Sequence, residues 1–391
     1  MQSEELSETS HKKLGRSKKT FVAPLGIIAA VVVITAGGVT LVNNTQFGSQ
    51  TVGSLPVASI TADDVRTDVT NDPPRNLIAA GRVAMSAYWT GNWKELGEAE
   101  HKLARGTLTT KVKRLSRTWH VYNPQRGTYE PTPWSWVDVA PGLQKAAVLE
   151  GELPSKRLGV LDLATQKALS WIDLPQGAAS VTWSPDGKNI LVTHYDRHPD
   201  EIEFVNANMR FGSKGLSPRS GFSIVDTTTM QAQFHSVTQE SRSTAHARND
   251  FSWAAPDLIS SAKGEAGGEL YFGLNGEKAN GPSNRAALSE DKVGQAGISP
   301  NGKLLAGPAG MPTKVVDRAT GQEVGSQRVL DLLAWADDSQ LIALGCEGNC
   351  ADEFHNGLVL VSVDGKQVTP LSAYRKDDGS DSTWHPVLTL R

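Results

Sequence analysis

Residues 181–195 read VTWSPDGKNILVTHY, and this stretch predicts a β-hairpin with a tight turn at its centre. Pro185 suits the second position of a tight turn because its ring holds φ at about −65°. Gly187 tolerates the positive φ that such turns require. Short runs of β-branched and apolar residues flank the turn, as strands require. One such hairpin is compatible with many antiparallel folds, so its repetition decides the fold class.

Large apolar residues followed by a similar turn recur along the chain. These anchors are Trp136, Trp183, Trp253, Ile298, Trp335 and Trp384. They lie roughly 40 to 70 residues apart, and each interval has room for about four short strands. Such repeats are typical of a β-propeller, in which every blade buries its faces against its neighbours. We therefore predict an all-β propeller over residues 77–391, with the anchor tryptophans packed between blades and not stacked on a ligand.

The anchors predict six blades, with seven as the alternative. Strands expected at residues 82–93, 109–123 and 128–133 have no anchor before them, whereas Trp384 is followed by a single expected strand at residues 386–390. Pairing these segments would close the ring with both ends of the chain and would leave no exposed sheet edge there.

Two segments depart from the repeat. The interval between Asp196 and Gly221 is an insertion, expected to form a long loop at a face of the ring. Long surface loops carry function more often than the core does. Residues 96–105 (LGEAEHKLAR) form a second insertion, expected to be a short helix.

The N-terminal part predicts a membrane anchor. Residues 21–42 carry no charge, and as a helix they would span about 33 Å, enough for a hydrocarbon core of roughly 30 Å. Five Lys or Arg residues lie within residues 1–20, and none follows the apolar segment before Arg66. The positive-inside rule therefore predicts a cytoplasmic tail, a single-pass signal-anchor helix in the cell membrane, and an extracytoplasmic C-terminal domain. A cleaved signal peptide is the alternative, but its apolar region would be shorter.

A linker is expected between the membrane segment and the propeller. Residues 43–76 are rich in Ser, Thr, Gly, Asn and Asp, lack a sustained hydrophobic period, and approach their end at Asp72-Pro73-Pro74. This composition predicts a flexible tether. The alternative is that the segment packs on the domain as an extended strand.

The turn motif resembles that of the WD40-like and TolB-like bacterial β-propellers, whose blades carry a WSPDGK-type turn. Residues 183–188 (WSPDGK) match it in full, residues 298–303 (ISPNGK) match it with two replacements, and residues 335–339 (WADDS) match it loosely. The Gly-His and Trp-Asp pairs of true WD40 repeats are absent, so the looser family is the better match. With the apolar segment in front, the chain is similar to membrane-anchored extracytoplasmic propellers of Gram-positive bacteria. The motif implies the fold and carries no catalytic residue.

No common catalytic motif is found in the sequence. It lacks the G-x-S-x-G elbow of serine hydrolases, the P-loop and the H-E-x-x-H zinc motif. The net charge of −3 provides no basic field for nucleic acid, so no nucleic-acid partner is expected. We expect no cofactor and no bound metal.

The two cysteines, Cys346 and Cys350, allow three interpretations. A metal pair would need further Cys or His ligands at suitable spacing, and only His355 lies near. A redox pair is the second possibility. Outside the membrane, a disulfide is the expected state.

The densest polar cluster begins at His194 and continues with the candidate binding residues Asp196, Arg197, His198, Asp200 and Glu201. Carboxylate and imidazole groups in this density could hold a cation or a charged ligand. An ordinary solvated loop is the alternative.

Two functions from different classes fit these features. The first is a non-catalytic binding platform at the cell envelope, tethered to the lipid bilayer and recognising a protein or a cell-envelope component. The alternative is an extracytoplasmic hydrolase or lyase with a site at the mouth of the propeller channel. Such a site needs acidic or basic side chains converging from several blades, and a fold alone does not establish it.

Overall fold

The computed structural model describes residues 64–206, 209–211, 218–237, 248–262, 269–281, 295–348, 350, 352–376 and 381–391. The chain divides into two units, residues 1–53 and 54–391, and all described residues belong to the second. The predicted tail at residues 1–20 and the predicted membrane helix at residues 21–42 lie outside them. Among the described residues, no helix has the length and apolar character needed to cross a membrane.

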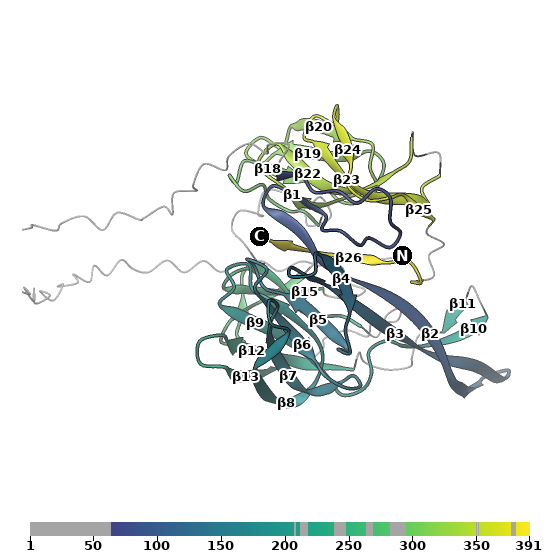
Figure 1. Ribbon diagram of the computed structural model, residues 1–391. Helices are drawn as coiled ribbons and strands as arrows, with labels where there is room; N and C mark the ends of the chain where they lie inside the picture. Colours follow the sequence, from purple (N-terminus) through teal and green to yellow (C-terminus); the bar gives the residue numbers. More distant parts are fainter. Residues whose placement is uncertain are drawn as a thin grey trace, which may run out of the picture. The chain divides into compact units, whose positions relative to one another are not determined.

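The described residues form an all-β structure of five antiparallel sheets, which confirms the predicted fold class (Figure 1). The first sheet contains β1 (Ala79–Ala80), β2 (Val83–Leu103), β3 (Gly106–Asn123), β4 (Thr128–Pro131), β10 (Glu201–Asn206), β11 (Met209–Phe211) and β26 (His385–Leu390). The second contains β5 (Trp136–Val139), β6 (Lys145–Leu149), β7 (Ser155–Asp162), β8 (Lys167–Trp183), β9 (Asn189–Tyr195), β12 (Arg219–Asp226) and β13 (Gln231–Ser236). The third contains β14 (Ser252–Ala255), β15 (Leu258–Ala262), β16 (Glu269–Gly273) and β17 (Lys278–Ala279). The fourth contains β18 (Leu304–Ala306), β19 (Thr313–Asp317) and β20 (Glu323–Gln327). The fifth contains β21 (Asp331–Trp335), β22 (Gln340–Cys346), β23 (His355–Ser362), β24 (Val368–Pro370) and β25 (Arg375–Lys376).

The expected hairpin at residues 181–195 is present, with β8 and β9 as its strands. The Ser184 hydroxyl donates to Asp186 Oδ1 (2.7 Å) and accepts the backbone N–H of Asn189 (2.9 Å), so these two side chains organise the turn. Gly187 adopts φ 70°, as expected. The same pattern recurs at Ser299 and Asn301 before β18. A third copy at Ser362 and Asp364 joins β23 to β24, so the turn serves positions that lack a tryptophan anchor.

The anchor tryptophans connect neighbouring groups of strands through their indole N–H groups. Trp183 Nε1 donates to the carbonyl oxygen of Asp138 (3.2 Å), and Trp253 Nε1 donates to that of Thr182 (3.1 Å). Trp335 makes the corresponding bond to Gly297. These bonds and the low exposure of Trp183 (6%) confirm a structural role for the anchors.

The number of separate sheets differs from the six or seven blades predicted. Residues 167–173 of β8 pair with β7, whereas residues 180–183 of the same strand pair with β9. Residues 174–177 (LPQG) change the partner of the strand without ending it. β8 therefore joins the strands β5 to β7 and the strands β9, β12 and β13 into one seven-stranded sheet, so the described residues contain five sheets.

The two ends of the described chain meet in the first sheet, as expected. β26 pairs antiparallel with β2, from Leu390 opposite Val83 to His385 opposite Trp89. A buried hydrogen bond of 2.7 Å joins the hydroxyls of Ser86 and Thr389. Antiparallel meanders in chain order, with the last strand returning to the first sheet, have the topology of a β-propeller.

The described part of the expected linker is not a flexible tether. Asp68 is 3% exposed, and its carboxylate accepts the backbone N–H groups of Arg75 (2.7 Å) and Asn76 (2.8 Å). Its own N–H donates to the carbonyl oxygen of Leu371 (2.8 Å). Residues 64–76 are therefore attached to the domain through Asp68 and the bridges at Arg66 and Asp68, because these hydrogen bonds override their loop-like composition.

The predicted helix at residues 96–105 is wrong, because this segment is the end of a long hairpin. β2 and β3 remain paired from Ala87 opposite Val121 to Leu103 opposite Gly106. β10 adds a third strand, from Glu201 opposite Arg114 to Phe204 opposite Lys111. We call residues 94–103, residues 106–114 and β10 the arm; it extends away from the rest of the first sheet (Figure 1). Helix-like spacing of apolar residues was outweighed by the β-branched partner strand TLTTKV and by backbone pairing.

The insertion between Asp196 and Gly221 is also more ordered than the expected loop. It contributes β10 and β11 to the first sheet before the chain returns to the second sheet at β12. The insertion therefore builds the arm together with strands from the first blade.

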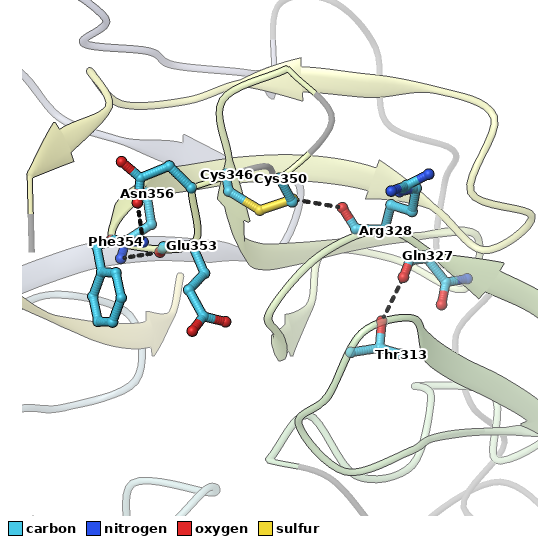
Figure 2. Close-up of a disulfide and its surroundings, with 9 residues drawn as sticks. Thr313, Gln327, Arg328, Cys346, Cys350, Glu353, Phe354 and Asn356 are labelled. Atoms are coloured by element: carbon cyan, nitrogen blue, oxygen red, sulfur yellow. Dashed lines mark hydrogen bonds between the residues drawn. A yellow bond between two sulfur atoms is a disulfide. The ribbon is translucent and has the colours of Figure 1, made fainter.

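Cys346 and Cys350 form the expected disulfide (Figure 2). Their Cα atoms are 4.9 Å apart, an ordinary distance for a disulfide. Cys350 Sγ lies 3.6 Å from the carbonyl oxygen of Arg328, and the nearby Phe354 is 55% exposed. The bridge closes the turn after β22 and holds it beside the segment before β21.

Candidate functional site

The structure separates the five predicted binding residues into two groups. Asp196 and Arg197 are exposed, and they follow directly after β9. His198, Asp200 and Glu201 lie beside β3 at the base of the arm. The candidate site is therefore the second group together with the residues that it meets there.

Asp200 is the centre of a buried ion network. It is 6% exposed, and both of its oxygens bind Arg117 of β3, at 2.7 and 3.1 Å. Arg248, which precedes β14, binds the same two oxygens at 2.6 and 2.7 Å. Burial alone would raise the pKa of Asp200, but hydrogen bonds and charge attraction from the two guanidinium groups hold that pKa well below its ordinary value. Asp200 therefore remains ionised and joins the base of the arm to the third sheet.

Arg248 extends the network towards the second sheet. Its guanidinium also binds both oxygens of Asp250, at 2.9 and 3.1 Å, and lies 4.5 Å from the ring centroid of Trp136. The Tyr195 hydroxyl donates to Asp250 Oδ1 (2.7 Å). Although burial works in the opposite direction, Asp250 and Asp200 raise the pKa of Arg248 further above its ordinary value. The network is thus internally neutralised and hydrogen-bonded, as buried charges need to be.

A cavity of about 540 Å³ opens beside this network. It is bounded by Lys94 and Leu96 of β2, residues 114–118 of β3, residues 132–135 after β4, residues 151–153 between β6 and β7, and His198. Arg114 crosses its rim, binding Glu201 through Nε (2.9 Å) and Nη2, and contacting Glu152 through Nη1. The cavity volume is typical of small-ligand sites.

His198 lines this cavity, and its neutral ring carries one hydrogen-bond donor. Its Nδ1 accepts the backbone N–H of Asp200 (3.2 Å), so the proton of the neutral ring is on Nε2. Burial lowers the pKa of His198, which favours that neutral form. His198 is therefore oriented by the segment that carries Asp200, and the predicted polar cluster does contribute to a cavity.

Several other polar groups of the cavity lining have no partner among the described residues. Thr132 Oγ1 is buried without a hydrogen bond. The side chains of Ser116, Thr118 and Trp134 form no hydrogen bond with another described residue. Of these residues Thr118 is exposed, and Ser116 and Trp134 are half-buried. Buried polar groups are rarely left unpaired, so the Thr132 hydroxyl at the cavity indicates a ligand contact.

Within the arm, a second polar cluster holds β10 against the hairpin of β2 and β3. The Thr110 hydroxyl donates to Glu203 Oε2 (2.9 Å), and His101 Nε2 lies 2.5 Å from the same oxygen. Phe204 packs edge-on against Trp93, with ring centroids 5.7 Å apart. These contacts attach the inserted strand to the hairpin and stiffen it.

Sequence reasoning missed Arg114, Arg117, Arg248 and Trp134. The arginines are far from Asp200 in the chain, with 83 residues between the positions of Arg117 and Asp200 and 48 between those of Asp200 and Arg248. The alternation in RLSRTWH at residues 114–120 indicates that Arg114, Ser116 and Thr118 share one face of a strand. No local signal indicates which insertion covers that face.

A serine–histidine pair occurs away from the cavity, and it is sealed. His194 Nε2 lies 2.7 Å from Ser223 Oγ, and its Nδ1 donates to the carbonyl oxygen of Gln176 (3.1 Å). Both side chains are fully buried, so no substrate can reach the hydroxyl. In a catalytic triad a carboxylate orients the imidazole, whereas here a backbone carbonyl oxygen does so. We interpret the pair as a structural bridge between β9 and β12.

The stability of the protein should depend on pH through His194 and Asp138 in opposite ways. Burial lowers the pKa of His194 to about 4, so the contribution of this residue to folding stability is present above about pH 6.5 and is lost as the pH falls towards 4. Burial raises the pKa of Asp138 to about 7, so its contribution is full below pH 3.8 and is lost as the pH rises through 7. The shifts of His194 and Asp138 correspond to changes of about 3 and about 4 kcal/mol, respectively, in the free energy of unfolding.

This dependence can be measured by urea denaturation of His194→Gln and Asp138→Asn between pH 4.5 and 7. On lowering the pH, the free energy of unfolding of His194→Gln should rise relative to the wild type, and that of Asp138→Asn should fall relative to it. Parallel curves for the three proteins would show that neither group titrates in this range.

Metal binding finds no support in the described residues, where no three His, Cys, Asp or Glu side chains form a group that could hold an ion. Asp200 and Glu201, which the sequence made candidates for a cation, are instead bound by arginines.

Comparisons with known proteins give distant structural similarities only. No family model matches this chain, and no curated protein matches it. TolB from Acinetobacter baumannii matches with 15% identity and a TM-score of 0.37, over 75% of this chain and 65% of its own. This chain therefore spans slightly less than two thirds of the TolB structure.

Two further solved structures are similar at the same level. Hsv2 from Kluyvelomyces marxianus shares 13% identity, with a TM-score of 0.34, over 66% of this chain and 70% of its own. The β-propeller domain of the Trilobed protease from Pyrococcus furiosus, described with an open velcro topology, shares 11% identity, with a TM-score of 0.39, over 77% of this chain and 84% of its own. Similarities this loose carry no argument about activity or partners, so the function has to be argued from the site.

Proposed function

We propose that this protein is a membrane-tethered, extracytoplasmic β-propeller that binds a protein or a cell-envelope component without catalysis. The partner would contact the arm and the cavity at its base. The apolar segment at residues 21–42 and the basic residues before it support the tether and its orientation. The sheet topology supports a propeller, and six anchors support six structural repeats, two of them joined by β8.

The observation that carries this proposal is the way in which the arm is held. An isolated two-stranded hairpin is marginally stable in water. Here residues 94–103 of β2 are mostly exposed, yet a third strand and the Asp200 network hold the hairpin in place. Leu103, which ends β2, is 48% exposed. A stiffened, exposed hairpin with an apolar residue at its end is suited to contact another molecule.

Photo-crosslinking in intact cells tests this proposal. A photoreactive residue at position 103 should give a discrete adduct with one partner. The matched control is position 169, because Leu169 of β8 is 53% exposed and lies outside the arm. Treating the cells with an external protease before illumination should abolish the adduct, because the arm would be extracytoplasmic.

Two outcomes would contradict the proposal. Equal labelling from positions 103 and 169 would show that the arm is an ordinary surface. An adduct that survives external protease in intact cells, but not in permeabilised cells, would place the arm in the cytoplasm.

A further inference from the structure

We propose that the cavity at the base of the arm binds an uncharged saccharide. This inference rests on the proposed function, because it names the chemistry that the platform would recognise at the same site. Three properties of the lining lead to it: its unpaired hydroxyl and N–H groups, its balanced charge, and its apolar and aromatic surface.

The unpaired polar groups are neutral, and most can both donate and accept. The Thr132 hydroxyl is buried and unpaired, whereas Ser116 is half-buried and Thr118 is exposed; no other described residue binds any of these hydroxyls, and each can donate and accept. Trp134 and His198 also line the cavity, and each of their neutral rings carries one N–H donor. Sugar hydroxyls also donate and accept, so this set matches them better than it matches a carboxylate or phosphate, which in its ionised form mainly accepts.

The charges at the cavity are already neutralised by protein partners. Arg117 is held by Asp200, and Arg114 by Glu201 and Glu152. Against the effect of burial, Glu201 and Glu152 raise the pKa of Arg114, as expected for a paired guanidinium. An anionic ligand would have to compete with these carboxylates. The remaining cation at the rim, Lys94, is exposed, where a charge attracts ligands only weakly.

The rest of the lining is aromatic and apolar. Trp134, which packs against Trp171 with ring centroids 5.7 Å apart, lines the cavity together with Leu96, Leu115 and Leu153. A pyranose ring has an apolar C–H face and a polar edge. An indole next to hydroxyl groups therefore complements both parts of the same molecule.

The test is calorimetric titration of the full-length protein in lipid nanodiscs with tri-N-acetylchitotriose, cellotriose and maltotriose. At least one of these neutral trisaccharides should bind in the millimolar range or more tightly. Trp134→Ala should weaken that binding about tenfold, since it removes both the ring and a donor. Phe354→Ala is the control, because it removes an exposed aromatic residue outside the cavity and should leave binding unchanged.

Thr132→Val separates a ligand contact from a structural role. The hydroxyl has no partner in the fold, so its replacement by a methyl group should leave the melting temperature unchanged or raise it. Saccharide binding should nevertheless weaken several-fold. A lowered melting temperature with unchanged binding would show that the hydroxyl serves the fold.

Failure of all three trisaccharides, or their displacement by inorganic phosphate, would overturn the saccharide assignment. If the adduct from position 103 persisted in that case, the binding platform would stand and only its ligand class would be wrong. Saccharide binding without any adduct from position 103 would support the cavity assignment and contradict the role of the arm.

Discussion

Deletion of residues 382–391 is expected to unfold the whole described domain. The deletion removes β26 and, with it, the pairing partner of residues 83–89 of β2. It also removes Trp384, which is 2% exposed, stacks under Arg375 at 4.2 Å, and donates its indole N–H to Asp72 (2.8 Å). Loss of one buried tryptophan side chain costs about 3–5 kcal/mol, whereas a native domain has about 5–15 kcal/mol in total. Removal of the strand as well should exceed the available stability.

Thermal unfolding followed by circular dichroism checks this expectation. The truncated protein should show no cooperative transition at room temperature or above. Deletion of Arg391 alone is the control, because it leaves β26 intact and should lower the melting temperature by only a few degrees. An unchanged melting temperature after deletion of residues 382–391 would show that closure through the C-terminal strand is dispensable.

Asp200→Asn should destabilise the protein by about 3–5 kcal/mol, because removal of one member of a buried ion network leaves the others uncompensated. Among the described contacts, Asp200 provides the only carboxylate that binds Arg117, so the change leaves this guanidinium without an ionic partner. Arg248 still binds Asp250. The wild type should also lose stability as the pH falls below about 4, because the pKa of Asp200 is lowered in the fold and the carboxylate is finally protonated. That acid-dependent loss should be smaller in Asp200→Asn. Urea denaturation at pH 7 and pH 3 measures both effects.

The neighbouring Glu201→Gln is the matched control. Glu201 pairs with Arg114, but their side chains are 31% and 25% exposed, so the expected loss is below about 1 kcal/mol. Equal destabilisation by Asp200→Asn and Glu201→Gln would show that the burial of the ion pairs does not determine how much they contribute to the free energy of unfolding. A double variant, Asp200→Asn with Arg117→Met, should recover part of the loss, because it also removes the unpaired guanidinium.

The same network links stability to the candidate cavity. The backbone N–H of Asp200 donates to Nδ1 of His198, which lines the cavity. Arg114 and Ser116 share one face of β3 and Arg117 lies on the other, so the strand carries the network and the cavity lining together. A variant that loosens the network is therefore expected to loosen the cavity too.

The features that the sequence predicted well are local ones. The turn at residues 184–187 depends on Ser184, Asp186 and Gly187, all within four positions of one another. Trp183 and Trp335 repeat in the same place relative to such turns, and both proved to be structural. The disulfide between Cys346 and Cys350 was expected from the scarcity of further metal ligands nearby and from the predicted extracytoplasmic location.

The incorrect predictions share one cause, which is hydrogen bonding to another segment of the chain. Residues 96–105 have a helical spacing of Leu96, Ala99 and Leu103, but the hairpin with residues 106–115 satisfies their backbone as strand. Residues 64–76 have a linker composition, but Asp68 is held by backbone groups and by Leu371. In both segments tertiary hydrogen bonds outweighed a weak local preference.

The sequence by itself determined the all-β repeat, because short motifs encode its turns. It also indicated the disulfide, and it indicated closure by the C-terminal strand, because the repeat left segments at both ends of the chain without partners. It also indicated the polar insertion after β9, but it placed Asp196 and Arg197 on equal terms with His198 and Asp200. Only the tertiary structure separated these residues, by bringing Arg117 and Arg248 to one carboxylate and by leaving Thr132 unpaired at a cavity. The physical reason is that burial and charge pairing depend on which strands meet, and no local pattern records that meeting.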